Sequence, residues 1–297
     1  MKWRGRRRSS NVRDDRNRRV SRGVPRGGGA LGSIISFAFR TFGIKGVVAL
    51  CAVGFVGAQL GLVDLSTLLG NGSEMGTGSP VQSSPEEADR YEFIEVVLAD
   101  TEDIWSNQFQ SIGKEYEEPQ LSIYRQVAET EGCGLGDARM GPFYCPADKT
   151  IYIDLSFYDE LASKFDAPGD FAQAYVVAHE VAHHVQNLLG IADRVAAKRG
   201  QPDYNEYSVR LELQADYFAG MWARRNQKYL EAGDIEEALR AAYQVGDDTI
   251  QERMQGRITP HTFTHGTSEQ RMRWFQRGVE LATMEGADTF SVRYEDL

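Results

Sequence analysis

The stretch AYVVAHEVAHHVQ, residues 174–186, constrains the fold most strongly because it joins a helical pattern to a metal-binding pattern. Around it, apolar residues recur every three or four positions, with Asp170 able to cap the start of a helix and Gly190 able to end it. Residues four apart share a helix face, so the imidazoles of His179 and His183 can bind one metal ion. Zinc would then require at least one more ligand from another segment of the chain.

Two neighbours of these histidines have different expected roles. Glu180 lies beside the proposed metal face, where a carboxylate can act as a general base. His184 turns away from that face on a helix, so we expect it to pack or to form a hydrogen bond.

A second helical stretch, NEYSVRLELQADYFAG, places Glu212 and Asp216 one turn apart. A lone pair of acids at this spacing is usually solvated surface. Here Leu211, Ala215 and Phe218 make the surroundings apolar, so inward-facing acids would be costly without a metal and its histidines. We therefore predict Glu212 as the third ligand and Asp216 as the partner that orients a ligand imidazole.

A third segment, THGTSEQRMRWF, contains His265 and Arg271. Thr267 and Gln270 fit a capping box, which predicts a helix start and leaves His265 in the preceding loop. Such a loop can lean over a metal site. The alternative is an ordinary histidine in a surface loop.

The elements HEVAH, ELQAD and HGTSEQR resemble, in this order, the gluzincin metallopeptidases, in particular the membrane prenyl-protein endopeptidases. The whole chain is more similar to the bacterial family described as "putative neutral zinc metallopeptidase", in its KWRGRR start, GPFYCPADKTIYID and FTHGTSEQRMRWFQRG. It differs from the prenyl-protein endopeptidases in its expected single span and in Gly266, where those enzymes usually have proline. The resemblance implies Zn²⁺ as cofactor, with these site residues: His179, His183 and Glu212 as ligands, Glu180 as base, and His265 with Arg271 near the oxyanion or among the groups that support it.

The expected activity is hydrolysis of a peptide or protein substrate. In such sites zinc lowers the pKa of its bound water toward about 7, and Glu180 would accept the proton. The strand expected at 151–154 offers an edge for pairing with a peptide. Two alternatives remain: hydrolysis of another amide bond, and a non-catalytic binding or scaffold protein that retains the site. A structural zinc site is normally closed by four protein ligands, often cysteines, and no cysteine lies near these helices.

Charge and hydropathy divide the chain unevenly. Residues 1–45 carry 13 of the 33 Lys and Arg residues but two of the 43 Asp and Glu residues, and residues 46–63 carry no charge. We predict a transmembrane anchor at 42–65, with the N-terminus cytoplasmic and the bulk of the chain outside a bacterial inner membrane. The lipid bilayer is then a partner, and nucleic acid is not expected at the arginine-rich start. A buried core helix and a cleaved signal peptide are the alternatives.

We predict that the whole chain divides into four regions: a basic cytoplasmic segment at 1–41, the anchor at 42–65, a Gly/Ser-rich flexible linker at 66–84, and a zinc metallopeptidase domain at 85–297. Cys133 and Cys145 flank a Gly-rich loop, and outside the cytoplasm they would form a disulfide. Two free buried thiols are the alternative.

Helical signals outnumber strand signals in the predicted domain. They cover 170–189, 205–231, 234–246 and 268–284, with a further capping box at Asp234 and Glu237. We therefore predict an α+β fold: a mostly helical, zincin-like metallopeptidase domain with a small sheet, preceded by one transmembrane helix.

Overall fold

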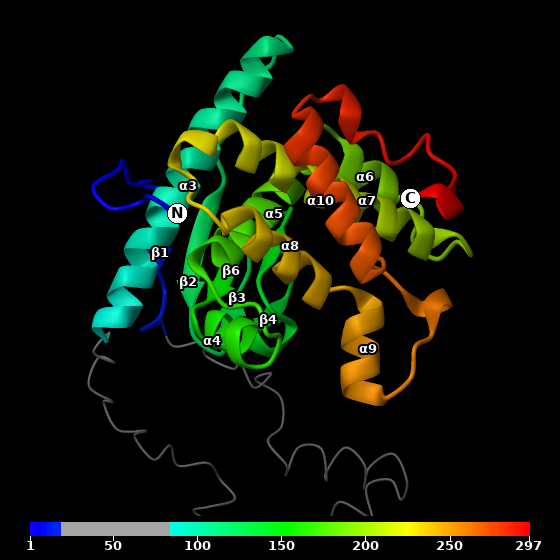
Figure 1. The fold of residues 1–297 in the computed structure, drawn as a ribbon, viewed down its shortest axis with the longest axis horizontal. Helices are drawn as coiled ribbons and strands as arrows, with labels where there is room; N and C mark the ends of the chain where they lie inside the picture. The colour runs from blue at the N-terminus through cyan, green and yellow to red at the C-terminus, as the bar shows by residue number, and fades with distance from the viewer. Residues whose placement is uncertain (19–83) are drawn as a thin grey trace, which may run out of the picture. The chain divides into compact units, whose positions relative to one another are not determined.

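A four-stranded sheet and a set of helices around one buried helix form the part of the chain that this computed structural model describes, residues 1–18 and 84–297 (Figure 1). The strand order is β1 (Val12–Asp14), β2 (Gln120–Tyr124), β6 (Thr150–Asp154) and β5 (Phe143–Cys145). The first three strands run parallel, and β5 runs antiparallel to β6. A separate hairpin joins β3 (Val127–Glu129) to β4 (Leu135–Asp137). Because β6 lies between two strands, the edge expected at 151–154 is already paired, and β5 is an edge strand instead.

The helices are mostly in the C-terminal half of the chain, as the sequence predicts. The central helix α5 (Asp170–Leu188) packs against α3, α7 and α8, and α10 packs against α7 and α8. Figure 1 shows α3 at one flank of the sheet and α7 with α10 at the other side. The other helices are α3 (Pro85–Ser111), α4 (Ser156–Ser163), α6 (Ile191–Ala196), α7 (Tyr204–Arg225), α8 (Asp234–Gln244), α9 (Asp247–Gln255) and α10 (Ser268–Leu281). The prediction of a mostly helical fold with a small sheet is confirmed.

Helix starts follow local capping in some places and tertiary contacts in others. The capping box predicted at Thr267 and Gln270 is present at the start of α10. The one predicted for α8 is absent, because the helix is capped by Gly233 and the Asp234 side chain binds elsewhere. Asp234 accepts hydrogen bonds from the backbone N–H of Glu231 and from the amino group of Met1.

Two glycines bring α7 and α10 into close contact. A Cβ at Gly220 would lie 2.0 Å from the carbonyl oxygen of Phe275, and one at Gly278 would lie 2.0 Å from the carbonyl oxygen of Tyr217. Neither position has room for a side chain, so the two backbones can approach directly. This approach lets Arg271 of α10 reach Asp216 of α7 in the interior.

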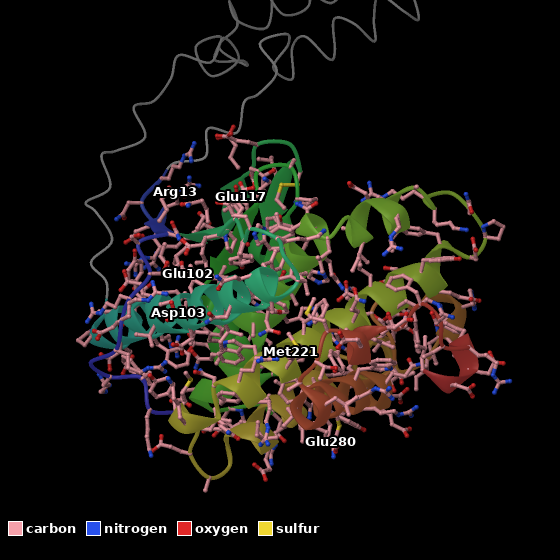
Figure 2. The ribbon with its side chains drawn as sticks, turned by 90° about the horizontal axis from the view of Figure 1, so that it is seen from above. Arg13, Glu102, Asp103, Glu117, Met221 and Glu280 are labelled. Atoms are coloured by element: carbon pink, nitrogen blue, oxygen red, sulfur yellow. A yellow bond between two sulfur atoms is a disulfide. The ribbon has the colours of Figure 1, made fainter. Side chains whose placement is uncertain are left out.

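The N-terminal segment, residues 1–18, is part of the same body as residues 84–297. Its strand β1 pairs with β2, and its arginines form ion pairs with acids along α3. Arg6 binds Asp100, and Arg7 binds Glu102 with a distance of 2.9 Å between Nη1 and Oε2. Figure 2 shows Glu102 on α3, the helix beside this segment. The arginine-rich start is therefore used in protein packing.

The transmembrane part of the predicted fold class is corrected. Within residues 1–18 and 84–297, no helix combines the length and the apolar character needed to cross a membrane. The span predicted at 42–65 lies outside the described residues. The described fold is a mostly helical one with a small sheet, and the membrane anchor and the lipid bilayer as a partner are not supported.

The predicted inner-membrane localisation is corrected for the same reason. The basic segment was misread because its acidic partners on α3 are about 90 residues away in sequence.

Candidate metal centre and cleft

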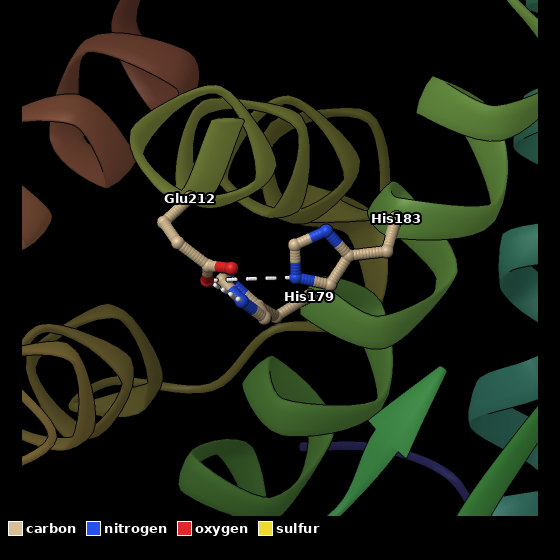
Figure 3. Close-up of side chains that lie close together, drawn as sticks. All are labelled: His179, His183 and Glu212. Atoms are coloured by element: carbon tan, nitrogen blue, oxygen red, sulfur yellow. Dashed lines mark hydrogen bonds and ion pairs between the residues drawn. The ribbon is translucent and has the colours of Figure 1, made fainter. Parts of the chain in front are cut away.

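Two helices bring three candidate metal ligands together. His179 and His183 lie one turn apart on α5, and Glu212 faces them from α7 (Figure 3). Glu212 Oε2 lies 3.1 Å from His179 Nε2 and 3.5 Å from His183 Nε2. The three candidate ligand atoms all lie within 4.8 Å of one another. The sequence-predicted ligands therefore converge on one point.

The donor set fits zinc. Two imidazole nitrogens and one carboxylate oxygen are common ligands of catalytic zinc, which keeps a further position open for water. Ligand atoms bonded to one tetrahedral ion at about 2.0–2.1 Å would lie roughly 3.3 Å apart. The separations of 3.1 and 3.5 Å from Glu212 to the two rings are close to that value.

The outer nitrogen of each ligand imidazole is held by a hydrogen-bond acceptor. His179 Nδ1 lies 2.9 Å from Asp216 Oδ1, and His183 Nδ1 lies 2.9 Å from Gln186 Oε1. Gln186 is fixed in turn, because its side-chain nitrogen donates to the carbonyl of Leu211 at 2.7 Å. Acceptors at both Nδ1 atoms leave both Nε2 atoms free to bind a metal.

Asp216 is the centre of a buried polar cluster. Arg271 donates from Nε to Oδ2 at 2.8 Å and from Nη2 to Oδ1 at 3.0 Å, and Tyr175 donates its hydroxyl to Oδ1 at 2.5 Å. The position of Asp216 beside His179 is the one that the sequence predicts. Arg271, expected near the oxyanion or its supporting groups, lies in this supporting cluster and also lines the cavity.

The electrostatics of the cluster favour positive charge at its centre. Burial raises the pKa of Asp216, but Arg271 and His179 outweigh it and lower the pKa to about 2. Burial likewise raises the pKa of Glu212, yet the two imidazoles hold it well below its usual range. Burial lowers the pKa of His179, while Asp216 and Glu212 together raise it to about 9. A divalent cation between these ligands would satisfy the same preference.

The three candidate ligands line a cavity of about 630 Å³, and Glu180 and His265 line it as well. Glu180 lies next to His179 on α5 and is buried. His265 comes from the loop before α10, so these two side chains border the cavity from different segments. Apolar residues from several elements complete much of the lining: Met140, Phe143, Phe157, Phe165, Val245, Ile250 and Met254.

His265 is held by an acid that sequence reasoning missed. Asp247, at the start of α9, accepts backbone N–H bonds from Thr264 and His265 at 2.7 Å, and from Gly266 at 3.2 Å. Its other oxygen lies 3.2 Å from His265 Nδ1. Burial lowers the pKa of His265, but Asp247 and Glu212 outweigh burial and raise it. No local motif points to Asp247, since it lies 18 residues before the histidine it orients.

The remaining predicted residues lie around the cleft. Cys133 and Cys145 form a disulfide with 5.9 Å between their Cα atoms, and it closes a loop whose residues 138–144 line the cavity. His184 does not join the ligands. As the sequence predicts, it turns away and forms hydrogen bonds with Tyr144 and with the backbone of Glu117.

Comparison with known proteins agrees with the geometry. The model of the family described as "putative neutral zinc metallopeptidase" matches residues 1–290. The uncharacterised protein YpfJ of Escherichia coli K12 is 48% identical over 302 residues, covering 98% of this chain and 99% of its own. An uncharacterised protein of Mycobacterium tuberculosis, Rv2575, is 43% identical over 189 residues, which is 59% of this chain and 64% of its own. No solved structure matches this chain.

The family match covers the three segments that meet in the cleft as well as the N-terminal segment that packs on α3. It supports a zinc-dependent peptidase at the level of the family. By this match and by its similarity to YpfJ, the chain belongs to the "putative neutral zinc metallopeptidase" family.

Proposed function

We propose that this protein is a zinc-dependent endopeptidase that hydrolyses peptide bonds in the cleft between α5, α7 and the loop before α10. The observation that carries the proposal is the convergence of His179, His183 and Glu212 beside Glu180 in one cavity. Three protein ligands leave a coordination position open, which suits a catalytic zinc better than a structural one.

The roles of the side chains follow from their placement. Bound zinc would supply Lewis acidity, which activates a water molecule and polarises the substrate carbonyl. Glu180 would accept the proton of that water and pass it to the leaving amine. His265, oriented by Asp247, would donate a hydrogen bond to the developing oxyanion. Asp216 and Gln186 would keep the two imidazoles in the ligand tautomer.

The strand β5 is the proposed binding edge for the peptide backbone. One side of β5 pairs with β6, and no strand among the described residues pairs with its other side. Phe143 and Tyr144 of this strand line the cavity that contains the ligands. A peptide added to this edge would form main-chain hydrogen bonds, which recognise an extended backbone with little demand on sequence.

The test is a cleavage assay with the purified protein and an unfolded protein as substrate. We expect cleavage that stops with a chelator and returns when zinc is added back. His183→Ala is the matched variant, because it removes a ligand and should lose cleavage at the same zinc concentration. Cleavage that persists unchanged in the chelator or in the His183→Ala variant would reject the proposal.

A further inference from the structure

The third histidine of HEVAHH forms a buried link between α5 and the sheet. His184 is fully buried, and its Nε2 lies 2.6 Å from the carbonyl oxygen of Glu117. A carbonyl only accepts hydrogen bonds, so Nε2 carries the proton in the neutral ring. Nδ1 is then the acceptor for the hydroxyl of Tyr144 at 2.9 Å. Figure 2 locates Glu117 in the segment between α3 and the sheet.

The Tyr144 hydroxyl is held by two residues of α5. Besides donating to His184, it accepts a hydrogen bond from Asn187 Nδ2 at 3.0 Å. The ring of His184 also lies edge-on to the ring of Tyr144, with 5.4 Å between centroids. The direction of every hydrogen bond in this chain is therefore fixed: Asn187 to Tyr144, Tyr144 to His184, and His184 to Glu117.

Tyr144 is the middle residue of β5, so this link bears directly on the edge strand. Its backbone is in register with Ile151 of β6, and the next residue, Cys145, is bonded to Cys133. The strand is thus fixed from three directions: by β6, by the disulfide and by α5. Of these three, the link to α5 joins the strand to the helix that carries His179 and His183.

We propose that His184 and Tyr144 are positioning residues that set the distance between the peptide-binding edge of β5 and the metal ligands of α5. The inference rests on the proposed peptidase function. A peptide paired with β5 must present its scissile carbonyl at the metal, and a displacement of about 1 Å can cost as much as a hundredfold in rate. Loss of the link would allow β5 to shift while leaving the ligands in place.

The test compares a peptide with a small metal-directed ligand. Both are titrated into zinc-loaded protein carrying Glu180→Gln, which prevents turnover, with and without Tyr144→Phe. We expect Tyr144→Phe to weaken binding of an extended eight-residue peptide by up to about tenfold, because the peptide must then bring β5 back to its position, and one buried hydrogen bond sets the upper limit of that cost. Acetohydroxamate reaches the metal without β5, so its affinity should stay within about twofold.

Tyr152→Phe is the matched control. Tyr152 lies on β6, and its hydroxyl donates to Asp148 at 2.8 Å and not to α5. This variant should bind the peptide as the parent does. In the active background, Tyr144→Phe should lower kcat as well as raise KM, because the peptide binds less well and its scissile carbonyl is displaced from the metal. His184→Gln should retain more activity than His184→Leu, because an amide can both donate and accept hydrogen bonds.

An unchanged peptide affinity in Tyr144→Phe would overturn the inference. Equal losses for the peptide and acetohydroxamate would overturn it too, since they would indicate damage to the metal site. Either result leaves the peptidase function standing if the parent protein still cleaves peptides with zinc. A parent protein that binds zinc but neither binds nor cleaves peptides would instead reject the proposed function, and the inference with it.

Discussion

Asp216 joins the candidate metal site to the core through a single carboxylate. It is fully buried and contacts His179, Tyr175 and Arg271. Arg271 is buried as well, so each charge depends on the other to offset the loss of hydration. One residue therefore affects both the orientation of a ligand and the stability of the α7–α10 contact.

Replacing Asp216 with alanine should destabilise the fold strongly. Arg271 would remain as a buried, uncompensated charge, which typically costs about 3–5 kcal/mol. Urea unfolding in chelator measures this cost without a contribution from metal binding. Glu269→Ala is the control, because it removes the exposed partner of Arg273 on the same helix and should cause no measurable change. Equal stabilities for the two variants would contradict the role given to the buried pair.

Asp247 should control the pH range over which His265 donates. The protonated ring is the donor, and Asp247 raises its pKa, so the donor form persists to higher pH. Asp247→Asn removes the negative charge, so the pKa of His265 should fall. The alkaline limb of the pH profile of kcat/KM should then move to lower pH. Asp248→Asn is the control, because Asp248 binds Ser268 and not His265. A limb that stays in place in Asp247→Asn would exclude His265 as the titrating donor.

Sequence alone could predict the three candidate ligands but only part of their surroundings. Glu212 and Asp216 stand out because charged residues at helical spacing lie among apolar ones, which indicates buried partners. Gln186 follows His183 by one helical turn, yet a glutamine at that spacing is ordinary. No periodic pattern in the sequence points to Asp247, because it reaches His265 only in the folded protein and from a different helix.

At the scale of elements, the N-terminal segment acts as a strand and as a set of cations for α3. Asp100 of α3 is buried and forms an ion pair with Arg6 of this segment. The side-chain nitrogen of Asn226 also donates a hydrogen bond to Asp100 Oδ2 at 3.0 Å. Burial raises the pKa of Asp100 even with these partners present. The segment therefore offsets charge that α3 would otherwise bury unpaired.

Arg6→Ala should lower the free energy of unfolding by about 3 kcal/mol, because it leaves Asp100 buried without its main cation. Arg4→Ala is a matched control in the same segment. Arg4 and its partner Asp89 are both exposed, so its loss should not measurably change stability. Thermal or urea unfolding of the full chain distinguishes the two. Similar behaviour of both variants would argue against docking of this segment on α3.

The elements that sequence predicts well are those with strong local signals. Helices α5, α7, α8 and α10 follow apolar periodicity and were expected within a few residues, apart from the end of α7. Strands β1 and β5 have three residues each, and their pairing with β2 and β6 depends on contacts distant in sequence. The arginine-rich start was misassigned for the same reason: its cationic pattern is local, while its acidic partners are not.

At the scale of the whole molecule, one wall of the cleft is formed by the loop at 133–145, which is closed by a disulfide. The disulfide between Cys133 and Cys145 closes this loop, and residues 138–144 form one wall of the cavity. Replacing both cysteines with serine should cost about 3 kcal/mol, as expected for a closed loop of this length. Unfolding of the oxidised parent and of the double variant measures the difference. A double variant as stable as the parent would contradict a structural role for the disulfide.

The central claim is that one zinc ion, held by His179, His183 and Glu212, is used for hydrolysis through Glu180. The most direct measurement is the peptide cleavage rate of Glu180→Gln protein, with the zinc content of the same sample determined by elemental analysis. We predict one zinc per chain, as in the parent, and a rate reduced by at least about a hundredfold, the usual contribution of a general base. Full cleavage by zinc-loaded Glu180→Gln protein would contradict the account.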